Sequence, residues 1–250
     1  MQKSKDKKTD IFEQFPVLKS IPKENFPQFN FIIPDGNRRY AKEHGKTVIW
    51  GHKKGFDVII KLLRNMRPLP VKIVGFWGFS SDNWKRNEQE IKGLMNIFEL
   101  MLTKYVGELM ENNSRFIHLG RKDRLPENLV KKIIETEEKT SRNTGQIVCA
   151  ALDFGGEDQM IRMLNKARGL DKNAEITPEL LHSLRDGNGI IPSADLIIRT
   201  SELRTSDVGW LNGKNTVLYF IPNKYFPDMN EEDVIKGIKF FYQTERRQGK

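Results

Sequence analysis

The sequence of 250 residues contains a single cysteine, Cys149. One cysteine excludes an internal disulfide and a cysteine-rich metal site, and its place within an apolar run predicts a buried structural thiol. No stretch reaches the roughly 18 consecutive apolar residues of a membrane span. The N-terminus also lacks the apolar segment of a signal peptide. These absences predict a cytoplasmic protein and leave a peripheral contact with a membrane surface open.

An excess of positive charge is the most distinctive feature of the composition. The chain has 42 Lys and Arg residues against 33 Asp and Glu residues, which gives a formal net charge of +9. Such a balance indicates an anionic partner: a nucleic acid, an anionic membrane surface or a phosphorylated small molecule. Part of the excess lies in the N-terminal tail, at Lys3, Lys5, Lys7 and Lys8. No dense basic stripe with aromatic residues follows this tail, so we expect no nucleic acid partner.

The hydrophobic pattern predicts one domain. Residues 1–28 are polar and contain three prolines, so we interpret them as a tail and an irregular lead-in to a domain of residues 29–250. In this domain, short apolar runs typical of strands alternate with helical periodicity. We expect strands at 30–33, 71–79, 115–119, 146–154, 195–198 and 216–221, and helices at 52–66, 88–109, 125–139, 157–167, 178–184 and 231–243. The alternation favours an α/β fold with a central, mostly parallel sheet flanked by helices.

The long helix expected at 88–109 carries an apolar stripe. Its members are Leu94, Met95, Ile97, Phe98, Met101 and Leu102. We expect this stripe to form one wall of an apolar tunnel between the sheet and the helices. The same periodicity is also typical of ordinary core packing, and the sequence does not separate the two interpretations.

Polar and basic residues follow several of the expected strands. The first strand ends at Asp35 to Arg39, the second at Ser80 to Arg86, the fourth at Asp153 to Gly156, and the fifth at Arg199 to Ser201. Arg204 and Ser206 come just beyond. The carboxyl ends of parallel strands meet at one edge of the sheet, where ligands bind. Guanidinium groups bind phosphate with two hydrogen bonds, and an Asp beside phosphates commonly holds Mg²⁺. The combination predicts a diphosphate site with Mg²⁺.

Each of these residues taken singly has a simpler interpretation. Asp35-Gly36 is a common turn dipeptide, and Ser80 or Ser81 can cap the helix that follows. A lone His52 is usually structural. Trp84 is more often a core or rim residue than a contact for substrate. Only their succession at the ends of several strands makes the diphosphate site the better hypothesis.

These motifs, in this order, resemble the cis-prenyltransferases, the family of undecaprenyl diphosphate synthase. The matching segments are Asp35-Gly36-Asn37-Arg38-Arg39-Tyr40-Ala41-Lys42, Gly51-His52-Lys53-Lys54-Gly55, Phe79-Ser80-Ser81-Asp82-Asn83-Trp84-Lys85-Arg86, Asn143-Thr144-Gly145, Phe154-Gly155-Gly156, Asp195-Leu196-Ile197-Ile198-Arg199-Thr200-Ser201 and Arg247-Gln248-Gly249. The resemblance covers about residues 30–249 and implies an Mg²⁺-dependent prenyltransferase. Such an enzyme condenses isopentenyl diphosphate with an allylic prenyl diphosphate to form a cis-polyprenyl diphosphate.

The resemblance also implies a role for each matched residue near the allylic substrate. Asp35 would be catalytic and would hold Mg²⁺ on the allylic diphosphate, and Asn37 would be catalytic beside the departing group. The remaining allylic contacts would come from the Gly36 backbone, Arg38, Arg39 and His52.

Other matched residues would serve the second substrate. Arg86, Arg199, Arg204 and Ser206 would bind the diphosphate of isopentenyl diphosphate. The catalytic Ser80 and the substrate-binding Trp84 would lie on a flexible segment that positions this substrate. Arg247 and Gly249 would reach the site across a homodimer interface, so the resemblance implies a homodimer.

Three departures from the family pattern concern the isopentenyl side. Glu202 replaces the usual Gly after Arg-Thr-Ser, Glu157 replaces an Arg after the two glycines, and Val217 stands where the family has a metal-binding Glu. An apolar side chain cannot bind Mg²⁺. A shifted register would let Glu202 or Asp207 supply the missing carboxylate. The alternatives are an atypical member that makes a short, branched or irregular terpenoid, or a non-catalytic partner subunit.

Overall fold

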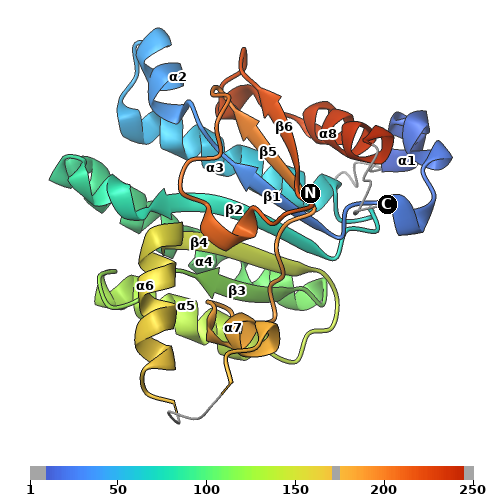
Figure 1. The fold of residues 1–250 in the computed structure, drawn as a ribbon. Coiled ribbons are helices and arrows are strands. Elements are labelled where there is room, and N and C mark those ends of the chain that lie inside the picture. The colour runs from blue at the N-terminus through green and yellow to red at the C-terminus, as the bar shows by residue number, and fades with distance from the viewer. Residues whose placement is uncertain (1–9, 171–174, 245–250) are drawn as a thin grey trace.

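Six strands form one sheet in the computed structural model, which describes residues 10–170 and 175–244 (Figure 1). Every neighbouring pair of these strands is parallel, and their order across the sheet is β3-β4-β2-β1-β5-β6. The strands are β1 (Phe29–Ile33), β2 (Ile73–Ser80), β3 (Arg115–Leu119), β4 (Ile147–Phe154), β5 (Leu196–Thr200) and β6 (Val217–Ile221). The predicted α/β fold with a central parallel sheet is confirmed.

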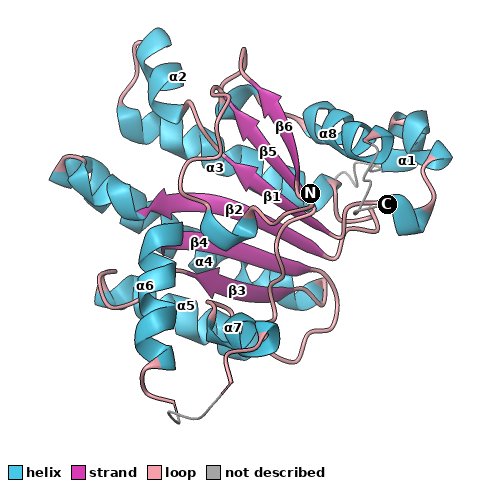
Figure 2. Cartoon of the chain, in the orientation of Figure 1, coloured by secondary structure: helices cyan, strands magenta, loops and turns pink. Residues whose placement is uncertain are grey.

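Helices cover both faces of the sheet. In Figure 2, α3 and α4 lie behind the strands, whereas α6 and α7 lie in front. The described α-helices are α1 (Ile11–Gln14), α2 (Asn37–Glu43), α3 (Val48–Asn65), α4 (Glu88–Glu111), α5 (Glu127–Thr140), α6 (Gly156–Ala167), α7 (Pro178–Leu184) and α8 (Glu231–Gln243). All positions of β1 and β5 are buried, as expected for parallel strands that are covered on both faces.

The lead-in before β1 packs against the domain. Ile11, Leu18, Ile21 and Phe26 are buried and belong to the apolar cluster that joins α3 and α8 to the sheet. The predicted irregular lead-in is thus wrong for residues 10–28, which form α1 and two short 3-10 helices, Pro16–Ser20 and Lys23–Asn25, and contribute to the core. The predicted polar tail with its four lysines falls on residues 1–9, outside the described residues.

Helix α2 was not predicted from the sequence. It has seven residues, of which only Ala41 is buried, so it shows no apolar stripe of helical period. The chain enters it through Gly36, whose φ of +99° makes a sharp turn directly after β1. The turn and this short helix together form one side of the space at the carboxyl ends of the strands.

Two predictions from apolar composition have different outcomes. Cys149 is a fully buried free thiol, as predicted, and burial raises the pKa of this thiol well above its ordinary value. Among the described residues, no helix has both the length and the apolar character needed to cross a membrane. The cytoplasmic location stays a prediction.

Candidate functional site

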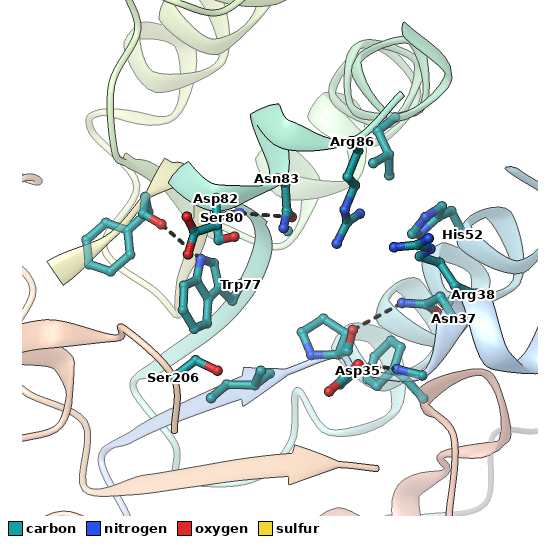
Figure 3. Close-up of a pocket in the computed structure, with 18 of the residues that line it drawn as sticks. Asp35, Asn37, Arg38, His52, Trp77, Ser80, Asp82, Asn83, Arg86 and Ser206 are labelled. Carbon is teal, nitrogen blue, oxygen red and sulfur yellow. Dashed lines mark hydrogen bonds between the residues drawn. The ribbon is translucent and has the colours of Figure 1, made fainter. Parts of the chain in front are cut away.

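A cavity of about 1460 Å³ opens at the carboxyl edge of the sheet (Figure 3). Its lining includes most residues predicted for the site: Asp35, Gly36, Asn37, Arg38, Arg39, His52, Ser80, Arg86, Arg199, Arg204 and Ser206. Trp84 is not part of the lining. Arg247 and Gly249 lie outside the described residues, so their predicted role stays a prediction.

The backbone of Asp35 is fixed by the neighbouring strand. Its N–H donates to the hydroxyl of Thr200 at 3.1 Å, and this hydroxyl donates to the Asp35 carbonyl at 2.7 Å. The same carbonyl accepts the N–H of Phe226 at 2.9 Å. A Cβ on Gly36 would lie 2.3 Å from the Ser201 hydroxyl, so only glycine fits at this turn. The Asp35 carboxylate is consequently held at the cavity wall.

Two guanidinium groups bind the Asp35 carboxylate. Arg39 lies one turn along α2 and donates to Oδ1 at 3.2 Å, and Arg199 at the end of β5 donates to Oδ2 at 2.9 Å. Oδ1 also accepts the N–H of Gly36 at 2.6 Å. Because Arg199 is only 4% exposed, its charge requires nearby anions. In this structure Asp35 is one of those anions.

A second carboxylate, that of Glu202, lies beside the first. Glu202 Oε2 accepts hydrogen bonds from Arg199 Nη2 and Arg204 Nε, both at 2.6 Å, and Oε1 lies 3.5 Å from Arg39 Nη2. Asp35 and Glu202 thus bind the same Nη2 atom of Arg199, which brings their oxygens close together. In the sequence, Glu202 stood out only as a departure from the family pattern that could supply the missing carboxylate. The structure places Glu202 in the cavity lining.

Asp207 and Val217, the other two positions considered for the missing carboxylate, do not lie beside Asp35. Asp207 lines the cavity, but its carboxylate accepts the N–H of Glu157 at 3.2 Å in the first turn of α6. Val217 is buried at the first position of β6, paired with Leu196 at the start of β5. It belongs to the apolar cluster beneath α8 and is not part of the cavity lining. The expectation that Val217 belongs to the isopentenyl side of the site is wrong, because Val217 is the first residue of β6 and lies at the amino edge of the sheet, opposite the cavity.

The glycines at 51 and 55 let two helices meet closely. A Cβ on Gly51 would lie 2.2 Å from the carbonyl oxygen of Asn37, and one on Gly55 would lie 2.3 Å from Asn37 Oδ1. Asn37 Nδ2 donates to the Pro34 carbonyl at 3.1 Å, whereas Oδ1 is buried and has no hydrogen-bond partner among the described residues. The glycine–histidine motif therefore packs α3 against the start of α2 and brings His52 to the cavity.

A buried carboxylate on α4 contacts one histidine and two arginines of the cavity. Glu90 is 3% exposed, and its Oε1 lies 3.2 Å from His52 Nε2 and 3.1 Å from Arg86 Nη1. Its Oε2 lies 3.8 Å from Arg38 Nε. Burial raises the pKa of the Glu90 carboxyl, but the hydrogen bond from His52 and the charges of Arg86 and Arg38 outweigh burial, so the pKa is lowered. Sequence analysis missed Glu90, because it resembles any other polar residue in a helix.

The segment after β2 contributes hydroxyl and amide groups. Residues Ser81–Lys85 form a short 3-10 helix, and the Ser80 N–H donates to Asn83 Oδ1 at 3.1 Å. Figure 3 shows Ser80, Asp82 and Asn83 on the opposite side of the cavity from His52 and Arg38. Trp84 turns away from the cavity, and its indole N–H donates to Asp153 at 2.9 Å.

The cavity ends at an apolar wall. Leu94 and Phe98 of the predicted stripe line it together with Phe56 of α3. The Phe56 and Phe98 rings meet edge to face, with centroids 5.6 Å apart. Both rings also border a separate apolar cavity of about 60 Å³ between α3, α4 and the sheet. The predicted tunnel is therefore not open in this structure, and it stays a prediction.

Taken together, the lining can neutralise several negative charges at once. Guanidinium groups enter from α2, the segment after β2 and the end of β5, and two carboxylates converge between them. Guanidinium groups and hard oxygen ligands are what a diphosphate with a divalent cation requires. The adjoining apolar wall fits a hydrocarbon group attached to such a diphosphate.

Known proteins similar to this chain are synthases and transferases of prenyl diphosphates. Residues 33–249 match the family model described as "Putative undecaprenyl diphosphate synthase". A ditrans,polycis-undecaprenyl-diphosphate synthase ((2E,6E)-farnesyl-diphosphate specific) of Vibrio vulnificus (strain YJ016) is 35% identical over 232 residues, which cover 90% of this chain and 92% of the relative. An isoprenyl transferase of Bacillus cereus (strain ATCC 14579) is 32% identical, and the match covers 98% of this chain and 96% of the relative.

A solved structure is also similar over most of the chain. The crystal structure of lavandulyl diphosphate synthase from Lavandula x intermedia, in complex with dimethylallyl diphosphate, superposes with a TM-score of 0.85 and 30% sequence identity. The match covers 91% of this chain and 100% of that one.

Proposed function

The chain belongs to the undecaprenyl diphosphate synthase family of cis-prenyltransferases, and we propose that the cavity at the carboxyl edge of its sheet is the active site. The chain is a transferase that condenses isopentenyl diphosphate with an allylic diphosphate to form a cis-polyprenyl diphosphate. The observation that carries the assignment of the site is the Asp35 carboxylate, bound by Arg39 and Arg199 at the wall of a cavity of about 1460 Å³. We assign the catalytic domain to residues 29–250.

The allylic diphosphate is proposed to bind at the turn between β1 and α2. Arg39 and the Gly36 N–H already bind a carboxylate there, and Arg38 and His52 approach from α2 and α3. Asn37 lies on the same side of the cavity as Arg38 and His52 (Figure 3), and its buried Oδ1 has no hydrogen-bond partner among the described residues. These groups suit an anion that gains charge as the allylic C–O bond breaks.

Isopentenyl diphosphate is proposed to bind at the ends of β5 and β2. Arg199 Nη1 donates to the Ser206 hydroxyl at 2.7 Å, which places Ser206 beside Arg204 and the cavity. Arg86 and the Ser80 segment lie on the facing wall. Holding both diphosphates aligns the two hydrocarbon groups and removes much of the entropic cost of their encounter.

The proposed metal is Mg²⁺, held by Asp35 with Glu202 as a second candidate ligand. The two carboxylates converge on Arg199 Nη2, and no group of three or more His, Cys, Asp or Glu residues that could hold a metal ion occurs among the described residues. This donor set fits Mg²⁺, which commonly takes one or two carboxylates and completes its shell with substrate phosphates and water. When bound, the ion would neutralise charge on the leaving diphosphate.

The reaction would then follow from alignment and charge neutralisation. The allylic C1–O bond breaks and its electron pair leaves with the diphosphate. The double bond of isopentenyl diphosphate attacks the allylic C1 to form the new C–C bond, and the proton lost from the adjacent carbon passes to the departing diphosphate. Arg38 and Arg39 stabilise the departing anion, and the apolar wall at Phe56 and Phe98 keeps water from the electron-deficient carbon.

A homodimer is part of this proposal. Met160, Ile161 and Leu164 form an exposed apolar patch on α6, and Ile161 also lines the cavity. Exposed apolar patches of this kind are typical of interaction surfaces, and a closed dimer is the commonest assembly. Sedimentation of the purified protein tests this, because a monomer that is fully active contradicts it.

A short-chain product is a second candidate. The Phe56–Phe98 pair separates the main cavity from an apolar space of only about 60 Å³, which cannot hold a long hydrocarbon chain. The similarity to a lavandulyl diphosphate synthase solved with dimethylallyl diphosphate is compatible with this candidate. A non-catalytic partner subunit is less well supported, because Asp35 and its cationic partners are all present.

One experiment tests the function and separates the candidates. The purified protein is incubated with Mg²⁺, labelled isopentenyl diphosphate and a series of allylic diphosphates of increasing length, and the products are sized. We expect label in an elongated product that depends on the allylic substrate. No incorporation with any allylic diphosphate would contradict the proposed function for the protein on its own.

A further inference from the structure

A fully buried carboxylate stands at the end of β4 without a role in the function described so far. Asp153 is 0% exposed, and its backbone has a φ of +53°, an uncommon value for a residue other than glycine. Its carbonyl accepts the N–H of Arg121 at 3.1 Å, which fixes the loop after β3. Asp153 does not line the cavity.

Its carboxylate joins two segments that do reach the cavity. Arg124 binds it through two nitrogens, with Nε donating to Oδ2 at 2.8 Å and Nη2 donating to Oδ1. Trp84 donates its indole N–H to Oδ1 at 2.9 Å. The Trp84 ring packs edge to face on Phe79, with centroids 5.1 Å apart. Through these bonds, Asp153 ties the loop after β3 to the segment that carries Ser80.

Stability alone does not explain this arrangement. A buried charge is commonly no better for stability than an apolar residue of similar size, because it loses its hydration, as Asp153 does here. The geometry that Asp153 imposes on its partners explains the arrangement better than a gain in stability. The residue whose geometry it fixes most strictly is Arg124, since two parallel hydrogen bonds set the plane of the guanidinium group.

The guanidinium group of Arg124 still has N–H donors that are not used in binding Asp153. Arg124 lines the cavity, and its side chain is 38% exposed. It lies near the segment that carries Ser80, because Arg124 and Trp84 bind the same carboxylate of Asp153. Its Nε and Nη2 face Asp153, whereas Nη1 makes no hydrogen bond to any part of the chain that the structure describes. An Nη1 group with two free N–H donors at a cavity wall suits an oxygen of a phosphate group.

We propose that Arg124 is a further substrate-binding residue that contacts the diphosphate of isopentenyl diphosphate, and that the buried Asp153 positions it. The proposal rests on the proposed function, because it uses the same cavity and the same substrate. Ser80 and Ser206 lie on this side of the cavity in Figure 3, away from His52 and Arg38. Arg124 therefore serves the isopentenyl side and not the allylic side.

The test must distinguish two roles of Arg124: contact with the substrate, and neutralisation of the buried charge of Asp153. Arg124→Gln alone leaves a buried charge unpaired and can fail to fold. The double variant Arg124→Gln/Asp153→Asn removes both charges and keeps an acceptor for the Trp84 indole. Lys122→Gln is the matched control, because Lys122 lies on the same loop and pairs with Glu137 at 3.2 Å outside the cavity.

We expect the double variant to keep the thermal unfolding midpoint of the wild type and to raise the KM for isopentenyl diphosphate about tenfold, as for one lost charge-assisted hydrogen bond. Its KM for the allylic diphosphate should stay within about twofold, as expected for a site-specific contact. Lys122→Gln should leave both KM values unchanged. A wild-type KM for isopentenyl diphosphate in the double variant would overturn the proposal.

A second variant keeps the test decisive if the double variant is unstable. Arg124→Lys keeps a positive charge for Asp153 but has a single nitrogen, which cannot bind both Asp153 and a phosphate in the same geometry. We expect a folded protein with a KM for isopentenyl diphosphate raised about threefold or more. An unchanged KM would again overturn the proposal. Failure of the proposed function is a different result, since then the wild type itself incorporates no isopentenyl diphosphate.

Discussion

The guanidinium group of Arg199 donates a hydrogen bond of 2.9 Å to the carboxylate of Asp35, across 164 positions of sequence. The parallel pairing of β1 with β5 produces this contact, because Ile33 and Arg199 are register partners at the ends of the two strands. Each residue is held by the other, so neither charge is left unpaired at the cavity wall. When substrate binds, a divalent cation can pair with Asp35 and a diphosphate can pair with Arg199, which replaces this internal pair.

The first prediction concerns Asp35. Asp35→Ala should lower the rate by about 10²–10³ or more, because it removes an oriented group that stabilises charge in the transition state. The measurement is product formation at saturating Mg²⁺, with circular dichroism to verify that the variant is folded. Near wild-type turnover in a folded Asp35→Ala protein would remove the basis of the proposed site.

The second prediction distinguishes the two candidate carboxylates. Glu202→Gln should raise the Mg²⁺ concentration needed for half-maximal activity, because it replaces the carboxylate beside Asp35 with a neutral amide, which attracts the cation less strongly. Asp207→Asn should leave the Mg²⁺ dependence near that of the wild type, since its carboxylate binds the start of α6. The opposite ranking in the Mg²⁺ titrations would assign the second ligand to Asp207.

The third prediction concerns Glu90 and pH. The folded-state pKa of this carboxyl lies below its ordinary value, so its stabilising effect is present above about pH 4.3 and is lost as pH falls through the lowered pKa. Glu90→Gln should therefore cost about 2 kcal/mol at pH 7, where the wild-type carboxylate binds His52, Arg86 and Arg38. Denaturant unfolding at a series of pH values measures the difference, which should shrink below pH 4. A difference that is independent of pH would show that the charge of Glu90 is not what stabilises the protein.

The fourth prediction follows from the position of Val217. A carboxylate at this buried position would lie in the apolar cluster beneath α8, so Val217→Glu should destabilise the protein by about 2 kcal/mol or more. It should bring no gain in Mg²⁺-dependent binding of isopentenyl diphosphate. Thermal unfolding and calorimetric binding measure the two effects, and tighter binding in a stable variant would contradict the position of β6.

The fifth prediction concerns product length. Phe56→Ala should open the main cavity into the apolar space behind it and shift the products to longer chains, because the Phe56 ring stands between the two spaces. Phe12→Ala is the control, since Phe12 is a half-buried ring that packs against a different apolar cluster. Chromatographic sizing of the products reads out the change. Identical products from Phe56→Ala and the wild type would show that this ring does not limit chain length.

Much of the fold was available from the sequence, because buried strands and amphipathic helices leave local periodic patterns. The strands predicted at 115–119 and 216–221 agree with β3 and β6 within one residue, and the helix predicted at 231–243 agrees with α8. Helix α2 was missed, since a short helix with one buried residue has no such pattern. The Asp35-Gly36 dipeptide nevertheless predicted the turn that precedes α2.

The sequence by itself determined which residues gather at the carboxyl edge, because a parallel sheet brings the ends of distant strands together whatever their loops do. Asp35 and Arg199 are placed by this rule alone. Only the tertiary structure decided which side chains face the cavity beyond the strands. Ser201 and Ser206 have φ values of +70° and +55°, and turns of this kind carry no period from which a side-chain direction can be derived. The turn after β5 brings Glu202 into the site, whereas Val217 lies at the amino end of β6 and Trp84 bonds to Asp153 outside the cavity. Arg124 joins the site through the same buried carboxylate of Asp153, a contact that no local pattern predicts.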